Sequence, residues 1–299
     1  MNKKMKADIT LLIVTLFWGF SFITTKTAIS NIEIFNFLFL RFTLAFLISA
    51  IIFYKDMKCI DKNIFVKSMI AGFILFLHFL FQTEGLKTTT ASKSAFITGF
   101  SVVLVPLFVS IIKREIPKLK IVLSVLIAFY GIILLSNVGF KDTNILTGDV
   151  YTFISAIAFA IYMILVEKFT SKEKAVVFGI LQIGFVAIYS LIFNLKYENF
   201  YIPTDIKSIS SIIFLSLFCT VFAYLAQSVA QNYTSSTHAS LIYSAEPIFA
   251  GIFSYIIYLE SLSTNKILGC LFIFTGMIIS ELKINKDSIK KLKFIKKSA

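Results

Sequence analysis

The amino-acid sequence predicts an all-α integral membrane protein with ten transmembrane helices, arranged as two inverted repeats of five helices. Composition is the first observation behind this prediction, since 58% of the 299 residues are hydrophobic and only 15% are charged. A soluble domain has roughly half its residues apolar and about a quarter charged. The second observation is a series of long apolar runs, which suit helices better than the alternating strands of a barrel. The third is an internal sequence repeat.

Ten apolar runs are long enough for membrane helices, which need about 20 mostly apolar residues each. The first run follows the basic start NKKMK, which resembles a secretory signal. No small-x-small cleavage site follows it, so we expect a retained first helix. Short linkers join the runs, as in a bundle of neighbouring helices. The expected spans are residues 9–29, 35–54, 65–86, 91–113, 119–136, 148–168, 175–195, 208–232, 236–258 and 264–282.

The second half of the sequence repeats the first. Residues 82–135 align without gaps on residues 227–280, at a spacing of 145 and with 12 identities in 54 positions. Apolar identities are expected by chance in so hydrophobic a chain, so the matches of Gln82 with Gln227 and of Glu115 with Glu260 are more informative. Each half holds five helices. Because five is odd, the halves are expected to cross the membrane in opposite directions.

The first helix of each half also repeats, at a spacing of 141. Asp8 corresponds to Asp149, and the pair Trp18-Gly19 corresponds to Phe159-Ala160. Acids at the start of a helix suit capping and the helix dipole, which is the role expected for both Asp residues. The replacement of Trp-Gly by Phe-Ala means that the two halves would line a shared cavity differently.

The distribution of basic residues predicts that both termini lie in the cytoplasm of a multi-pass protein of the cell membrane. Of the 29 Lys and Arg residues, 21 fall in segments on the same side as the termini and 6 on the other side. This asymmetry follows the positive-inside rule, which explains the net charge of +13 without a nucleic-acid partner. The expected domains are the first repeat at 1–140, the second repeat at 141–282 and a basic cytoplasmic tail at 283–299, which suits anionic membrane lipid.

Several local motifs, in this order and at the repeat spacing, resemble the drug/metabolite transporter superfamily, EamA type. They are Trp18-Gly19-x-Ser21-Phe22 with Lys26, Arg41 in LRF, ASKSAFITGFSVVLVP, AEPIFAGIF, and the turns at Glu115 and Glu260. The resemblance covers nearly the whole chain. It implies a secondary transporter, an exporter, of small metabolites such as amino acids, with a small-molecule substrate. It does not identify the substrate.

Glu246 is the most informative polar residue, because a charge deep in a span costs about 2.5–3.5 kcal/mol. Pro247 follows it and is expected to bend the helix and free the carbonyl of Tyr243. An acid beside a bend in the middle of a helix is typical of a substrate or proton site. The alternative is a hydrogen-bonded Glu that fixes helix packing.

Two polar faces are expected to meet at the interface of the repeats. His78 and Gln82 lie four residues apart on one helix, and Gln227 and Gln231 do the same on its repeat partner. Such faces either line a site near the middle of the membrane or hold helices together by hydrogen bonds, which contribute about 0.6 kcal/mol each on average.

The first two spans add three more candidates. Trp18 and Phe22 share a helix face with Lys26, and Trp18 lies too deep for the membrane interface, so an aromatic cavity wall and ordinary packing are both open. Lys26 is expected to extend to the outer surface. Arg41 either binds an anionic group of the substrate or pairs with Glu33.

Two other classes of function remain open. An intramembrane enzyme would need a nucleophile and a base within the spans, and the sequence holds neither GxSxG nor HExxH. A lipid-handling scramblase is the other alternative. The three Cys residues have no metal-binding spacing, so no metal or cofactor is expected.

Overall fold

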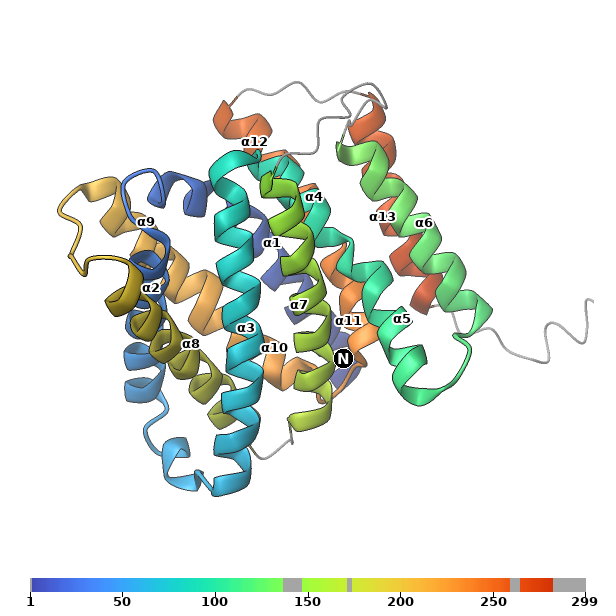
Figure 1. Ribbon diagram of the computed structural model, residues 1–299. Helices are drawn as coiled ribbons and strands as arrows, with labels where there is room; N and C mark the ends of the chain where they lie inside the picture. Colours follow the sequence, from blue (N-terminus) through green and yellow to red (C-terminus); the bar gives the residue numbers. More distant parts are fainter. Residues whose placement is uncertain (1, 137–146, 171–173, 259–263, 282–299) are drawn as a thin grey trace, which may run out of the picture.

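The computed structural model describes residues 2–136, 147–170, 174–258 and 264–281, and every regular element in these ranges is a helix (Figure 1). Long apolar segments without water must satisfy their backbone groups internally, which a helix does. The elements are α1 Lys3–Ala28, α2 Ile34–Ile52, η1 Asp56–Cys59, α3 Lys62–Thr88, α4 Ala91–Gly99, α5 Ser101–Lys113, α6 Leu119–Ser136, α7 Thr147–Phe169, α8 Ala175–Tyr197, α9 Ile206–Ser216, η2 Leu217–Phe222, α10 Ala223–Ala230, α11 Ser236–Tyr243, α12 Glu246–Tyr258 and α13 Thr264–Glu281.

Eight of the ten predicted spans are long and apolar enough to cross a membrane within the described residues. The other two, α6 and α13, contain shorter apolar stretches, Leu119–Leu134 and Ile267–Gly276. An all-helical integral membrane protein is therefore confirmed, while the count of ten spans stays a prediction. The expected tail at 283–299 and Glu260 lie outside the described residues.

Three of the predicted spans are interrupted rather than continuous. One breaks between α4 and α5 at Phe100, and another breaks between α11 and α12 at Ser244 and Ala245. The third runs from α9 to α10 through η2, a π-helical turn. The first two breaks lie 145 residues apart, and α5 with α12, and α6 with α13, begin and end 145 residues apart. Broken membrane helices often line binding sites.

Helices from the two halves pack side by side throughout the bundle. In Figure 1, α6 and α13 form a pair at the right, and α3 lies against α7 near the centre. Gly131 of α6 and Gly276 of α13 are equivalent in the repeat. A Cβ added at Gly131 would lie 2.6 Å from the Gly269 carbonyl oxygen, and one at Gly276 would lie 2.7 Å from that of Ser124. Both glycines therefore allow close packing of this helix pair.

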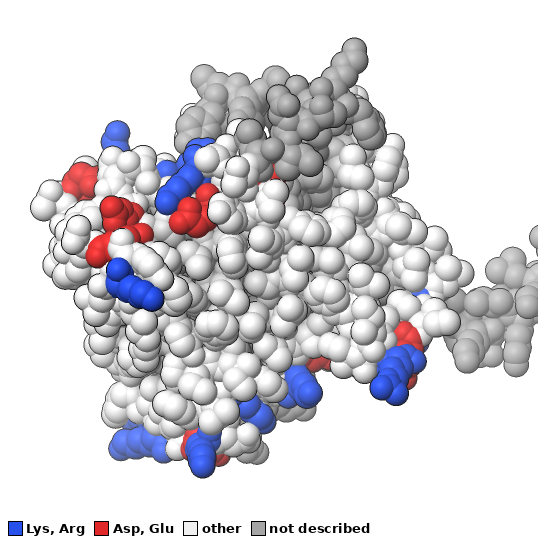
Figure 2. Space-filling model, in the orientation of Figure 1, with Lys and Arg blue, Asp and Glu red and all other residues white. Residues whose placement is uncertain are grey.

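Charged side chains gather at two opposite ends of the bundle, with an uncharged band between them (Figure 2). Asp61 at one end caps α3, because its carboxylate accepts the Ile64 N–H at 2.7 Å, and it also pairs with Lys174 at 2.5 Å. The Ile64 N–H and then Lys174 hold the pKa of Asp61 below its ordinary value. The uncharged band is where lipid is expected to contact the protein.

The expected capping roles of Asp8 and Asp149 are only half right. Asp149 lies in the first turn of α7, where the helix dipole favours an acid. Asp8 is wrong as a cap, since α1 begins at Lys3 and places Asp8 in its second turn. Asp149 pairs with Lys93 of α4, and Asp8 lies beside His238 of α11.

Candidate functional site

A small cavity is enclosed by side chains from helices of both halves of the sequence. Its volume is about 10 Å³, which is about what one water molecule needs. Any ligand larger than a water molecule would fit only if the helices moved apart. The lining residues come from α1, α2, α3, α4, α7, α10 and α12: Trp18, Ser21, Arg41, His78, Phe79, Gln82, Thr98, Phe159, Tyr224 and Glu246.

Arg41 brings a cation to the cavity from the middle of α2, with only 2% of its surface exposed. The expected alternative pairing with Glu33 is wrong, because Glu33 lies at the start of α2, two turns away, and the Arg41 Nε donates instead to Thr220 Oγ1 at 3.0 Å. Its guanidinium carbon lies 4.7 Å from the centre of the Phe79 ring. Within the described residues, its terminal nitrogens have no hydrogen-bond acceptor.

Glu246 brings an acid to the same cavity, 7% exposed. The expectation that it lies in the middle of a continuous helix is wrong. It is the first residue of α12, with Pro247 second, because Pro fits the first turn of a helix, where no backbone donor is lost. The helix dipole favours an acid there and offsets part of its burial cost. In the described part of the chain, the carboxylate accepts no hydrogen bond and forms no ion pair, not even with Arg41.

Four aromatic residues, Trp18, Phe79, Phe159 and Tyr224, contribute to the cavity wall. Trp18 lies among three rings, with ring centres 5.7 Å from Phe159, 5.3 Å from Tyr224 and 5.0 Å from Tyr243. Its indole N–H donates to the Cys219 carbonyl at 3.1 Å, which fixes the ring. Rings packed edge to face in this way make a rigid apolar wall.

Gly19, the neighbour of Trp18, sets the distance between α1 and α12. A Cβ at this position would lie 2.6 Å from Phe249 Cβ, 2.8 Å from the Ala250 nitrogen and 2.9 Å from the Glu246 carbonyl oxygen. No side chain fits at such distances without moving the backbone of α12. The glycine therefore allows the start of α12, with Glu246, to reach the cavity.

His78 and Gln82 both line the cavity, as expected from their shared helix face. The Ser155 hydroxyl donates to the His78 carbonyl at 2.9 Å and lies 2.8 Å from His78 Nδ1. If its single hydrogen goes to that carbonyl, then Nδ1 carries the ring proton and donates to Ser155 Oγ. Ser155 is fully buried between α3 and α7 and does not line the cavity, so this Ser–His contact joins helices.

Three predicted site residues lie near the cavity but do not line it. Phe22 packs in a separate apolar cluster with Leu86 and Ala250. Tyr243 stacks against Trp18, and its buried hydroxyl has no hydrogen-bond partner among the described residues. Gln227 is fully buried and donates to Gln231 at 3.1 Å. Whether these residues take part in binding stays a prediction.

Five lining residues were not predicted from the sequence. They are small polar or aromatic residues, which do not stand out in an apolar run: Ser21, Phe79, Thr98, Phe159 and Tyr224. Three of them could have been selected from the repeat spacing. Phe159 is the equivalent of Trp18 at the 141 spacing, and Phe79 and Tyr224 are equivalent to each other at the 145 spacing.

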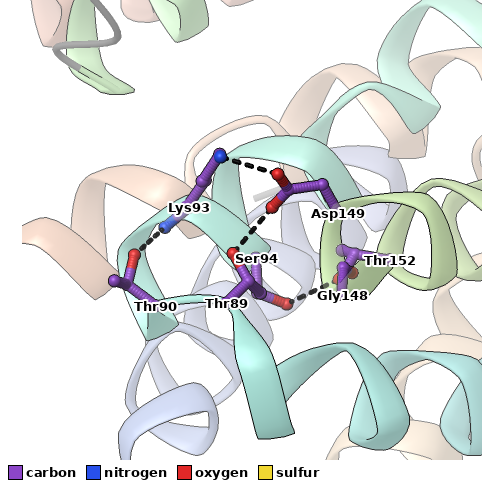
Figure 3. Close-up of polar contacts among 7 residues, drawn as sticks. All are labelled: Thr89, Thr90, Lys93, Ser94, Gly148, Asp149 and Thr152. Carbon is purple, nitrogen blue, oxygen red and sulfur yellow. Dashed lines mark hydrogen bonds and ion pairs between the residues drawn. The ribbon is translucent and has the colours of Figure 1, made fainter. Parts of the chain in front are cut away.

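A polar network lies at one end of the helices that line the cavity. Figure 3 shows Lys93 and Thr89 meeting Asp149 of α7, with Lys93 Nζ at 2.6 Å and Thr89 Oγ1 at 2.8 Å from its two oxygens. Lys26 of α1 donates to the Thr89 carbonyl at 2.5 Å, so it does not simply extend to the surface as expected. The network joins α1, α3, α4 and α7, all of which line the cavity.

The opposite end holds an equivalent contact. His238 Nε2 of α11 lies 3.3 Å from Asp8 Oδ1 of α1. Asp8 is the repeat equivalent of Asp149 at the 141 spacing, and His238 is the equivalent of Lys93 at the 145 spacing. Beside this contact lies a hollow of about 290 Å³ between the end of α5 and the start of α11, lined in part by Lys113, Glu115, Glu167 and His238.

No group of three or more His, Cys, Asp or Glu side chains that could hold a metal occurs within the described ranges. The polar chemistry of the site is therefore that of Arg41, Glu246, His78 and Gln82, surrounded by rings. Such a site can bind a small molecule, because its polar groups can contact the charges of the molecule and its rings can contact the apolar part of the molecule.

Comparison with known proteins finds the same organisation among transporters. Residues 5–137 and again residues 146–282 match the EamA-like transporter family. An uncharacterized transporter of Archaeoglobus fulgidus is 30% identical over 283 residues, covering 94% of this chain and 88% of the relative. A second from that organism is 26% identical over 286 residues, covering 93% and 98%. The uncharacterized transporter YetK of Bacillus subtilis is 21% identical over 300 residues, covering 94% and 88%.

A solved structure, described as "Crystal structure of protein", has the same fold. Its TM-score is 0.74, and the match covers 93% of this chain and 96% of that chain at 15% sequence identity. At this identity the likeness concerns the fold alone.

Proposed function

The chain belongs to the EamA-like transporter family and is a transmembrane transporter, and from this premise we propose that it exports small metabolites, such as amino acids or related compounds, across the cytoplasmic membrane by alternating access. One observation carries this proposal. Arg41 and Glu246 face the same buried cavity and neither pairs with the other. Unpaired buried charges are costly, so their retention favours a ligand that supplies the missing partners.

A zwitterion has the chemistry that this cavity lacks. Its carboxylate would meet the free guanidinium edge of Arg41, and its ammonium group would meet Glu246. A purely anionic metabolite would leave Glu246 unpaired, and a purely cationic one would leave Arg41 unpaired. Trp18, Phe79 and Phe159 would surround the apolar part of the substrate. Protons are the proposed coupling ion, since a buried carboxyl group can exchange them.

The proposed mechanism needs two inverted repeats, residues 1–140 and 141–282, related by a two-fold axis through the cavity. Side chains on such an axis touch their own equivalents. Trp18 and Phe159 are equivalents with ring centres 5.7 Å apart, and Phe79 and Tyr224 are equivalents with ring centres 5.8 Å apart. These contacts, and the matching breaks in α4–α5 and α11–α12, support the repeat.

Alternating access then requires a closure at each end of the bundle, that is, a contact between helices that blocks the path from the cavity to that side of the membrane. The pairs Lys93–Asp149 and His238–Asp8 are repeat equivalents at opposite ends, so we assign them as the two closures. The hollow beside His238 would be the cytoplasmic entrance. The positive-inside rule supports this orientation, with both termini in the cytoplasm and Lys93–Asp149 on the outside.

Transport by purified protein in proteoliposomes tests the proposal. Radiolabelled neutral amino acids are offered with and without a pH gradient, beside amines and carboxylic acids of similar size. Saturable transport of a zwitterion is expected, and transport is expected to be faster when a pH gradient is imposed across the liposome membrane. Empty liposomes and liposomes with the Arg41→Ala variant are the controls. Transport confined to single-charge compounds, or no transport of any zwitterion, would refute the two-charge site.

A further inference from the structure

The π-helical turn η2 contacts two of the cavity-lining helices at once. A π-turn widens a helix by one residue and often marks a functional site. The Ala223 N–H bonds to the Thr220 carbonyl, and the Cys219 carbonyl accepts the indole N–H of Trp18 from α1. The Cys219 thiol also donates to the Phe17 carbonyl at 3.3 Å. The turn is thus bonded to α1 through both the backbone and the side chain of Cys219.

The same turn holds α2 at both the backbone and the side chain of Arg41. The Ser216 hydroxyl, directly before the turn, donates to the Arg41 carbonyl at 2.8 Å. Thr220 Oγ1 accepts from Arg41 Nε at 3.0 Å, while its own hydrogen goes to the Leu215 carbonyl at 2.9 Å. A hydroxyl has one hydrogen, so donation to Leu215 leaves the Thr220 oxygen as an acceptor aimed at Nε.

Two aromatic rings also lie next to the guanidinium group. Its carbon lies 4.7 Å from the centre of the Phe79 ring and 5.3 Å from that of Phe42. With Nε bound by Thr220 and the guanidinium carbon close to the Phe79 ring, the two terminal nitrogens are left as a pair of donors. Two parallel N–H groups in one plane match the two oxygens of a carboxylate.

We propose that Thr220 is a positioning residue that holds Arg41 in the orientation needed to bind a substrate carboxylate, and that η2 is the structural basis of this specificity. The inference rests on the proposed function, since it names the substrate group that the same cavity recognises. A phosphate also suits two parallel donors. Its second negative charge would face Glu246 across a cavity with no other cation among its described lining residues, so the carboxylate of a zwitterion is the better match.

The test compares Thr220→Val, which keeps the branched shape and removes the hydroxyl, with Thr220→Ser, which keeps the hydroxyl. The probe is the neutral amino acid that wild-type protein transports fastest in proteoliposomes. Its competitor is the corresponding amine, which lacks the carboxylate. Loss of a hydrogen bond to a charged group corresponds to about a tenfold weaker interaction or more.

We expect Thr220→Val to raise the KM for the amino acid about tenfold, with inhibition by the amine unchanged and the maximal rate nearly unchanged. Thr220→Ser is expected to stay close to wild type. A merely structural role would instead weaken amino acid and amine together. Wild-type values for Thr220→Val, or equal losses for both ligands, would overturn the positioning role. If Thr220→Val does not fold, Thr220→Ala is judged by the same two readouts.

Arg41→Lys separates this inference from the proposed function. Lys keeps the charge and loses the two parallel donors. If Arg41→Lys weakens amino-acid transport while Thr220→Val does not, Arg41 recognises the carboxylate and the positioning role alone is wrong. If neither variant changes the preference for amino acid over amine, the two-charge site itself is wrong.

Discussion

Replacing Glu246 by Gln separates a binding acid from one that only packs α12. Gln keeps the shape and the hydrogen-bonding capacity of the side chain but cannot ionise. In the structure, the carboxylate has neither a hydrogen bond nor an ion pair within the described residues and is 7% exposed. The substitution therefore removes an unpaired buried charge rather than a contact of the folded protein.

The expected effect on stability is small. The burial cost of the charge disappears, and the favourable interaction with the start of α12, about 0.3–1 kcal/mol, disappears with it. These two effects oppose each other, so the Tm of purified Glu246→Gln protein is expected to stay within a few degrees of wild type or to rise.

The expected effect on transport is large. A hydrogen bond to a charged group contributes about 1.5–3 kcal/mol, which corresponds to roughly 10- to 150-fold in affinity. We expect transport of a zwitterion at low concentration to fall at least tenfold, or to lose its dependence on a pH gradient, in proteoliposomes. Glu84→Gln is the matched control, because Glu84 forms an exposed pair with Lys87 at 3.2 Å and such pairs contribute little.

The outcome is clear in either direction. Wild-type transport and pH dependence in Glu246→Gln would show that the acid serves helix packing. A large drop in Tm together with lost transport would show a structural role that the absence of contacts does not predict. Loss of transport, or of its dependence on a pH gradient, at normal stability and with Glu84→Gln unchanged, is the result that agrees with a functional acid.

Three further predictions concern packing, the closures and topology. Gly19→Ala is expected to cost about 1–3 kcal/mol and to lower the Tm. Gly251→Ala should not, because no atom of another described helix lies within 4 Å of a Cβ added there; equal Tm values would refute the close-approach argument. Lys93→Met, which breaks the outer pair, is expected to increase labelling of Ser21→Cys by an impermeant maleimide from outside, and His238→Met, which breaks the inner pair, to decrease it; unchanged labelling would contradict the two closures. In intact cells, Ser30→Cys should be labelled and Ser298→Cys protected in a Cys-free background, and the reverse would overturn the orientation.

Much of the fold could be predicted because hydropathy and repeat spacing are direct properties of the sequence. Arg41, Gln82 and Glu246 could be selected for the same reason, since a polar side chain inside an apolar run is conspicuous. The repeat predicted that Gln82 would face an interface between the halves, but it did not predict that Arg41 and Glu246 would line the same cavity. The role of each residue is a different matter, because a charge inside a membrane protein either binds a ligand or another side chain, and only the neighbours decide.

The interrupted helices could not be predicted in the same way. Hydropathy averages over a whole turn, so it reports one run where the backbone forms two helices. Pro247 predicted a bend, and the structure has a helix start there, whereas Pro106 lies inside α5. The π-turn Leu217–Phe222 has no Pro or Gly to indicate it. Its register depends on Trp18 and Arg41, which are distant in the sequence.

The cavity combines a symmetric wall with asymmetric charges. Trp18 meets its equivalent Phe159, and Phe79 meets Tyr224, so the aromatic wall is nearly the same in both halves. The charges have no such partners: at the 141 and 145 spacings, Arg41 corresponds to Gln182 and Glu246 to Ser101. In the proposed mechanism, a wall with equivalent rings in both halves would keep its shape whether the outer pair or the inner pair is closed. In the proposed function, two opposite charges at non-equivalent positions would hold an asymmetric substrate in one orientation while the cavity opens to one side of the membrane and then to the other.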